Sequence, residues 1–177
     1  MEDTLGTTVS VGQLYGRQKV ANIVLEGARF WGRPNFAGEM DRFNEAKRQF
    51  TVKIPNEVAD QLRDLGWNVK TTIPENEEDE PISSLKVKLS FTFDDNHPGD
   101  VEYERGPDIT VIRGENREQL NSKTVGILDR SRFENIDMEL RAWEYDPKNS
   151  PNQFSARLVE LVAVLRPSRL KDKYDLR

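Results

Sequence analysis

Aromatic and basic side chains are concentrated between residues 29 and 53 of the chain. Flat aromatic rings can stack on the unpaired bases of a single nucleic-acid strand, and cations can bind its phosphates. The segment has six basic and three acidic residues, which is a net charge of +3. Its first part, "ARFWGRPNFAG" (28–38), also holds glycines, at which a backbone can approach a ligand closely. The segment is therefore suited to binding a single strand.

The same aromatic residues have a competing explanation, which is packing in a hydrophobic core. Phe50 alternates with Val52 and Ile54, so we expect it to be buried. Phe30 and Trp31 are neighbours, and on a strand they point to opposite faces, so one can be buried while the other is exposed. Phosphate contacts are expected from Arg29, Arg33, Lys47, Arg48 and Lys53, and base stacking from Trp31, Phe36 and Phe43, with Trp67 as a further candidate.

A second candidate surface is the polar face of residues 85–93. Lys86, Lys88, Ser90 and Thr92 share one face of this predicted strand and could follow the phosphates of a nucleic acid. The solvent face of an ordinary antiparallel strand has the same pattern, so both interpretations stay open.

Period-two alternation of apolar and polar residues predicts strands over most of the chain. The predicted strands cover residues 19–27, 48–54, 85–93, 108–113, 137–145 and 154–167. The last of these changes its apolar phase near Leu158 and Val159, which predicts a β-bulge. We therefore expect a mainly β fold, an OB-fold-like antiparallel β-barrel with one or two short α-helices. Barrels of this type carry ligands on a strand face and its adjacent loops.

One helix is predicted over "PNEVADQLRDLG" (55–66). Asn56 is the expected N-cap and Gly66 the expected C-terminal stop. Val58, Leu62 and Leu65 fall on one face of this helix. A second helical turn is expected within "SKTVGILD" (122–129).

The net charge of −5 is unevenly distributed along the chain. Residues 71–110 contain eleven acidic and three basic side chains, which leaves 20 acidic and 23 basic elsewhere. The acidic stretch "TTIPENEEDEPISS" (71–84) predicts a mobile loop. This loop is either a solvated excursion or an arm that competes with nucleic acid or contacts a partner. Residues 1–15 and 168–177 are expected to be weakly ordered ends of a single domain spanning 1–177.

Composition excludes several kinds of site. The chain has no cysteine, so disulfides, zinc–thiolate sites and a cysteine nucleophile are excluded. The single histidine, His97, lies in the turn-like "DDNHPGD" and is expected to be a solvated loop residue. In the same turn Asp94, Asp95 and Asp100 could hold Mg²⁺ in a nuclease, although a solvated loop explains them better.

No apolar run approaches the roughly 18 to 20 residues that span a membrane. The N-terminus does not resemble a signal peptide, so an intracellular protein is expected.

The segment "LEGARFWGRPNFAGEMDRFNEAKRQFTVKIPNEVADQLRDLGWNVK" resembles single-stranded DNA-binding proteins encoded by tailed bacteriophages. The resemblance rests on Asn35-Phe36-Ala37-Gly38, Phe43-Asn44, Phe50 and Gly66-Trp67-Asn68-Val69-Lys70. "VGILDRSRFENIDMELRAWEY" and "FSARLVEL" are similar to the second half of that family, so the resemblance covers most of residues 20–165. It implies an OB barrel that coats single strands during phage replication or recombination, in the cytoplasm of an infected bacterium, with no cofactor, no metal and no catalysis.

Two departures from the family pattern stand out. Residues 45–48 read Glu-Ala-Lys-Arg, where the family tends toward a basic, glycine-bearing segment. Many single-strand binders end in an acidic tail that recruits partners, whereas this chain ends in "RLKDKYDLR". The only candidate for an acidic recruiting element is internal, at residues 75–80.

The sequence leaves two functions of different classes open. The leading prediction is sequence-independent binding of single-stranded DNA, and the alternative is a protein-interaction module in which the aromatics anchor a partner. The expected partners are single-stranded DNA, phage replication or recombination proteins, and a second copy of the chain in a homodimer; no membrane partner is expected.

Overall fold

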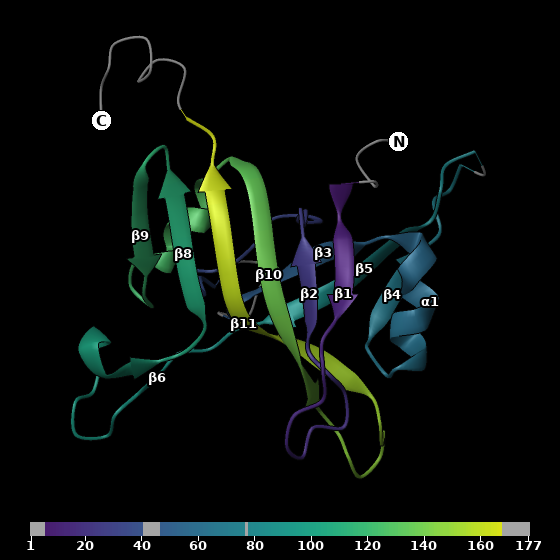
Figure 1. Cartoon of the computed structure of the whole chain (residues 1–177), viewed down its shortest axis with the longest axis horizontal. Helices are drawn as coiled ribbons and strands as arrows, with labels where there is room; N and C mark the ends of the chain where they lie inside the picture. Colours follow the sequence, from purple (N-terminus) through teal and green to yellow (C-terminus); the bar gives the residue numbers. More distant parts are fainter. Residues whose placement is uncertain (1–5, 41–46, 77, 168–177) are drawn as a thin grey trace.

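The described part of the protein is built on a mixed sheet of nine strands, with a separate two-stranded sheet beside it (Figure 1). The computed structural model describes residues 6–40, 47–76 and 78–167. The large sheet consists of β1 (Thr8–Val11), β2 (Ile23–Glu26), β3 (Gln49–Ile54), β4 (Val69–Thr72), β5 (Ile82–Lys88), β8 (Asp108–Arg113), β9 (Asn116–Leu120), β10 (Phe133–Glu144) and β11 (Phe154–Leu165). The small sheet consists of β6 (Thr92–Phe93) and β7 (Glu104–Arg105), and the helical segments are α1 (Asn56–Asp64) and the 3-10 turns η2 (Val101–Tyr103) and η3 (Val125–Arg130).

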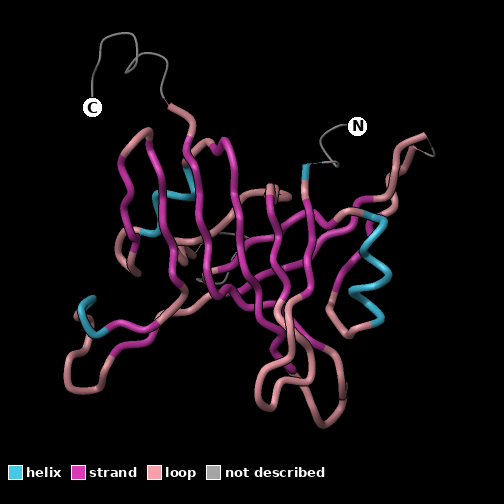
Figure 2. The backbone as a smooth tube through the Cα atoms, in the orientation of Figure 1, coloured by secondary structure: helices cyan, strands magenta, loops and turns pink. Residues whose placement is uncertain are grey.

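The main path through the sheet is β1-β2-β10-β11-β5-β3. β4 pairs with β5, and β8 pairs with both β11 and β9. β11 runs parallel to β5 and to β8, and the other pairs are antiparallel. In Figures 1 and 2 strands β3 and β5 cross the direction of β2 and β10 at a steep angle, so the sheet bends over on itself. The prediction of a mainly β, OB-like fold is confirmed.

The sheet does not close into a barrel through the described strands. The outer edge of β3 is occupied by the irregular segment 29–35, through bridges from Phe30 to Val52 and from Asn35 to Gln49. A strand whose edge is already hydrogen-bonded cannot pair with another strand. Residues 29–35, the first part of the aromatic and basic segment, therefore form an irregular strip along the edge of β3.

Strands β10 and β11 form the longest hairpin, with 12 residues in each strand. Glu139 pairs with Glu160, whereas the next residue, Leu140, pairs with Leu158. Val159 is thus the extra residue of a β-bulge, which confirms the bulge predicted from the phase change.

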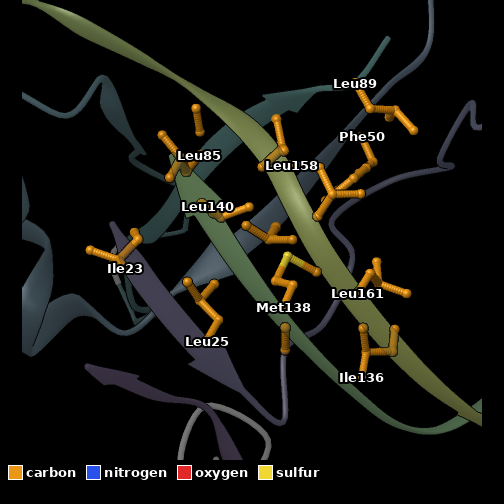
Figure 3. Close-up of a cluster of buried hydrophobic side chains, with 14 of the residues drawn as sticks. Ile23, Leu25, Phe50, Leu85, Leu89, Ile136, Met138, Leu140, Leu158 and Leu161 are labelled. Atoms are coloured by element: carbon orange, nitrogen blue, oxygen red, sulfur yellow. The ribbon is translucent and has the colours of Figure 1, made fainter. Parts of the chain in front are cut away.

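The core lies inside the bend of the sheet, between β2, β10 and β11 on one side and β3 and β5 on the other (Figure 3). Every second residue of these strands points into it, as the alternation predicts. Ile23 and Leu25 come from β2, and Leu140 comes from β10; all three are fully buried.

Helix α1 ends at the predicted position but begins differently. Asn56 is its first residue rather than its cap, and its amide instead donates to Pro81 O and accepts from Ser83 Oγ. Leu62 is buried as expected, while Leu65 is 45% exposed. Gly66 adopts a φ of +104°, a conformation that glycine adopts without strain and other residues rarely do. The second predicted helical turn appears as the 3-10 turn η3.

Several predicted segments differ from the structure. Residues 8–11 form β1, paired with β2, and so are not a loose end; residues 1–5 and 168–177 lie outside the described residues. Strands β4 and β5 take residues 71–72 and 82–84 from the predicted acidic loop. The predicted strand 85–93 stops after Lys88. Strands β1, β4 and β9 were not predicted, because they are short and mostly exposed and so lack an apolar alternation.

Candidate nucleic-acid interface

A groove of about 830 Å³ lies on the outward face of β3, β4 and β5. It is bounded by the edge segment of β3 on one side and by the β10–β11 hairpin on the other. Four lysines and two aromatics dominate its lining, and we call it the lysine groove. Its lining residues are Trp31, Lys47, Gln49, Thr51, Asn68, Lys70, Ser84, Lys86, Lys88, Tyr145 and Ser155.

Strand register places the lysines of the groove side by side. Lys86 lies opposite Thr51, and Lys88 lies opposite Gln49. Lys70 of β4 lies opposite Ser84. Because successive side chains of a strand alternate between faces, Val87 points into the core while Lys86 and Lys88 point outward.

The groove is strongly basic although the whole chain is acidic. Its lining has Lys47, Lys70, Lys86 and Lys88, and no Asp or Glu among the residues that the structure describes. Four positive charges converging in a concave surface concentrate the field and attract an anionic chain. The net charge of −5 therefore does not describe the surface that a ligand meets here.

Trp31 and Tyr145 provide exposed rings at opposite sides of the groove. Trp31 is 36% exposed and Tyr145 is 49% exposed. The Trp31 backbone is fixed by the hydrogen bond that its N–H donates to Thr51 O, at 2.8 Å. An anchored backbone with an accessible ring suits a stacking residue, because little conformational freedom remains to be lost on binding.

The structure brings four of the predicted site residues together in this groove: Trp31, Lys47, Lys86 and Lys88. Arg29 and Lys53 line a smaller neighbouring depression beside Ile54 and Pro55. Arg33 lines another depression with Lys123 and Arg130, where Glu39 and Asp129 add negative charge. Phe43 lies outside the described residues.

Phe36 and Trp67 are core residues, which contradicts their predicted role in base stacking. Phe36 is 0% exposed and stacks on Phe50, with the ring centroids 5.0 Å apart. Trp67 is 2% exposed, and its backbone bridges to Phe154. A ring with no accessible face cannot meet a base. Aromatic composition alone did not distinguish these residues from Trp31, because burial depends on neighbours that are distant in sequence.

Arg48 makes structural contacts within the fold, and its predicted phosphate contact stays a prediction. Its Nη1 donates to Phe36 O at 2.8 Å, and its guanidinium lies 4.9 Å from the centroid of the Phe91 ring. Burial lowers the pKa of the Arg48 guanidinium, while the nearby carboxylates of Glu104 and Asp129 oppose this change. Arg48 therefore supports the loop that contains Phe36.

Lys70 and Tyr145 are groove residues that the sequence patterns did not assign to the site. Lys70 follows Trp67 in "GWNVK", which stands out only for its likeness to the family. Tyr145 is the last residue of the predicted strand 137–145, and the residue on each side of it is acidic. Lys70 comes beside Lys86 and Lys88 through the pairing of β4 with β5, and Tyr145 through the pairing of β10 with β11 and of β11 with β5.

The described part of the chain has neither a metal centre nor a membrane-spanning helix. Among these residues, no three His, Cys, Asp or Glu side chains lie close enough to hold a metal ion, and this includes Asp94, Asp95 and Asp100. His97 stacks on Tyr103, with centroids 3.6 Å apart, and its Nδ1 lies 3.2 Å from Asp94 Oδ2. No helix in this part of the chain is long and apolar enough to cross a bilayer.

Comparison with known proteins gives one family and two similar structures. Residues 13–175 match the model of a family described as "Putative phage ssDNA-binding domain". The single-stranded DNA-binding protein from bacteriophage Enc34, solved in complex with ssDNA, is 14% identical, with a TM-score of 0.47 over 83% of this chain and 88% of that chain. The single-stranded DNA-binding protein gp2.5 of bacteriophage T7 is 9% identical, with a TM-score of 0.32 over 85% of this chain and 96% of that chain. No curated protein sequence matches significantly.

Proposed function

The chain belongs to the phage single-stranded-DNA-binding family, and we propose that it binds single-stranded DNA, without sequence preference, in the lysine groove. The observation that carries the site is the convergence of four lysines and two exposed aromatic rings in one concave surface. Lys47, Lys70, Lys86 and Lys88 contact phosphates in this proposal, and Trp31 stacks on a base.

The lack of sequence preference follows from the chemistry of the groove. Every base has a π-face, so stacking on Trp31 tolerates any base. A lysine ammonium binds a phosphate as a point charge and reads no base edge. The lining also has side-chain hydroxyls and amides, such as those of Thr51, Gln49 and Asn68. These groups can hydrogen-bond to the sugar–phosphate backbone of the DNA, which carries no sequence information.

The biological role follows from family membership. We propose that the protein coats exposed single strands during phage replication or recombination, in the cytoplasm of an infected bacterium, and that it acts by binding alone. The alternative role as a protein-interaction module is not favoured by the family match. The two roles also differ in their response to salt, because phosphate contacts release counterions and an aromatic protein interface does not.

The test is a titration of the full chain with oligo-dT at several salt concentrations, in which tryptophan fluorescence is the readout. A parallel titration with duplex DNA is the control. Quenching that weakens as salt rises, with little response to duplex, supports the proposal. The variant Lys86→Ala/Lys88→Ala is expected to lose affinity, while Lys123→Ala, which removes an exposed lysine outside the groove, retains it. Equal binding by both variants would refute the groove as the site.

A further inference from the structure

Trp143 is a large aromatic side chain that faces solvent beyond the lysine groove. It lies near the end of β10 and is 47% exposed. The guanidinium of Arg157 on β11 lies over its ring, 4.7 Å from the centroid. Neither residue lines the groove, so the binding surface described above does not account for this pair.

Strand register places Trp143 in the same transverse row as Trp31. Trp31 donates its N–H to Thr51 O, and Thr51 lies opposite Lys86. The parallel pairing of Ala156 with Val87 puts Ser155 beside Lys86, and Ser155 lies opposite Trp143. The row Trp31–Thr51–Lys86–Ser155–Trp143 therefore runs across the strands, with a tryptophan at each end and a lysine at its centre.

The length of this row follows from the spacing of strands. Adjacent strands are about 4.8 Å apart, so the four intervals put the two tryptophan positions about 19 Å apart along the sheet. A separation of this size is too large for one base to bridge. Two tryptophans at this distance can stack on two different bases of one strand.

A second transverse row beside the first is basic. Arg141 lies opposite Arg157, and Arg157 lies beside Lys88 in the parallel pairing of β11 with β5. These three cations continue the positive surface from the groove to the β10–β11 hairpin. The row is bounded by the pair Glu139 and Glu160, which precedes the bulge. The positive surface therefore runs across the strands rather than along them.

The stability of the hairpin does not explain the pair. The core side of β10 and β11 already carries buried residues such as Leu140, Leu158 and Ala156. A cation–π contact at an exposed site adds little to stability. Arg157 Nε is buried without a hydrogen-bond acceptor among the described residues.

We propose that Trp143 and Arg157 form a second contact site for the same DNA strand, with Trp143 stacking on a base and Arg157 binding the adjoining phosphate. The strand then crosses β3, β5, β11 and β10, and its bases are held at both ends of the row by Trp31 and Trp143. This inference rests on the proposed function, because it extends the path of the strand that the lysine groove binds.

Fluorescence can observe the two ends separately, because the third tryptophan, Trp67, is buried and contributes a constant background. The probe is an oligo-dT of about 16 nucleotides, the upper end of the site sizes of such domains. In Trp31→Phe, quenching is expected to persist and now reports Trp143. In Trp31→Phe/Trp143→Phe, quenching is expected to disappear while binding, followed by anisotropy of a labelled oligo-dT, continues. Loss of all quenching in Trp31→Phe, while this variant still binds the labelled oligo-dT, would overturn the second site.

Affinity distinguishes stacking from packing at Trp143. Trp143→Leu keeps apolar bulk but has no π-face, and is expected to weaken binding about 5- to 150-fold, the equivalent of one lost stack. Trp143→Phe keeps a π-face and is expected to lose less affinity than Trp143→Leu. The matched control is Tyr103→Ala, which removes an exposed ring from the segment between β6 and β7.

The outcomes separate this inference from the proposed function. If Trp143→Leu binds like the original protein while Lys86→Ala/Lys88→Ala binds weakly, the second site is wrong and the groove stands. If Trp143→Phe is as weak as Trp143→Leu, stacking is wrong. If the original protein binds no oligo-dT at low salt, the proposed function itself fails.

Discussion

Phe30 and Trp31 are adjacent in sequence and lie on opposite faces of the sheet. Phe30 packs edge-to-face against Phe50 and Phe133, with ring centroids 5.2 and 5.4 Å apart. Trp31 is 36% exposed and lines the lysine groove. One residue therefore anchors the edge segment to the core while its neighbour is presented to a ligand, as the alternation of side chains along an extended strand requires.

This division predicts opposite effects of two aromatic substitutions. Trp31→Ala is expected to weaken binding of oligo-dT about 5- to 150-fold, the value of one stacked base, with the melting temperature almost unchanged. Phe36→Ala is expected to lower the free energy of unfolding by about 3 to 5 kcal/mol, because it leaves a cavity in the core. Urea denaturation and DNA titration of both variants measure the two effects. A Phe36→Ala protein of normal stability would contradict the core assignment.

The lysines of the groove predict a specific dependence on salt. Each phosphate contact on a single strand contributes a slope of about 0.7 in log affinity against log salt, so four lysines predict a slope of about −3. Lys86→Ala and Lys88→Ala are each expected to make the slope less steep by about 0.7. Titrations at four or more salt concentrations give the slopes. Lys123→Ala is the control and should leave the slope unchanged.

Gly66 predicts a strong effect on stability. A Cβ at this position would collide with Asn152 O and lie 2.8 Å from Phe154 Cδ2, and the φ of +104° disfavours any other residue. Gly66→Ala is therefore expected to destabilise the fold by more than the roughly 1 kcal/mol of backbone strain alone. Gly99→Ala is the matched control, because Gly99 has a φ of +74° and no atom within 4 Å of the added Cβ. Equal unfolding free energies for the two variants would refute the steric argument.

Glu144 predicts a pH-dependent contact between two loops. The N–H of Asn152 donates to Glu144 Oε2 at 2.7 Å, and Lys19 Nζ lies 2.9 Å from Glu144 Oε1. These contacts lower the pKa of the Glu144 carboxyl from its usual value, the Asn152 bond more than the lysine. A carboxyl with a lowered pKa contributes stability above its unfolded pKa of about 4.3, and this is lost as pH falls through the folded pKa.

The measurement for Glu144 is an NMR titration of its side-chain carboxyl. Its midpoint is expected below the usual value for glutamate, and Lys19→Ala should shift it upward. A midpoint at or above the usual value would show that neither contact persists in solution.

Local features of the sequence anticipated much of the fold. The alternation in 48–54 and 108–113 corresponds closely to β3 and β8, because an amphipathic strand has to direct its apolar side chains to one face. The phase change at Leu158 and Val159 located the bulge, since one extra residue reverses the faces. Helix α1 ends just before Gly66, as predicted, because glycine adopts a positive φ without strain.

The candidate site was only partly predictable. The sequence indicated Trp31, Lys47, Lys86 and Lys88 through residue type and alternation, and all four line the groove. It also suggested Phe36 and Trp67, which lie in the core. Residue type does not separate a stacking ring from a packing ring, because both are large, flat and apolar.

Residue types and their alternation specify the chemistry available and the face that each strand residue takes. Which faces come together depends on the assembled fold. Lys70 reaches the groove through the pairing of β4 with β5, and Tyr145 through the pairing of β10 with β11 and of β11 with β5. Trp143 joins the row of Trp31 through the register of β3, β5, β11 and β10. Some of these pairings join residues far apart in the chain. The sequence alone did not indicate them, because strand register is set by the packing of the whole core and not by local propensity.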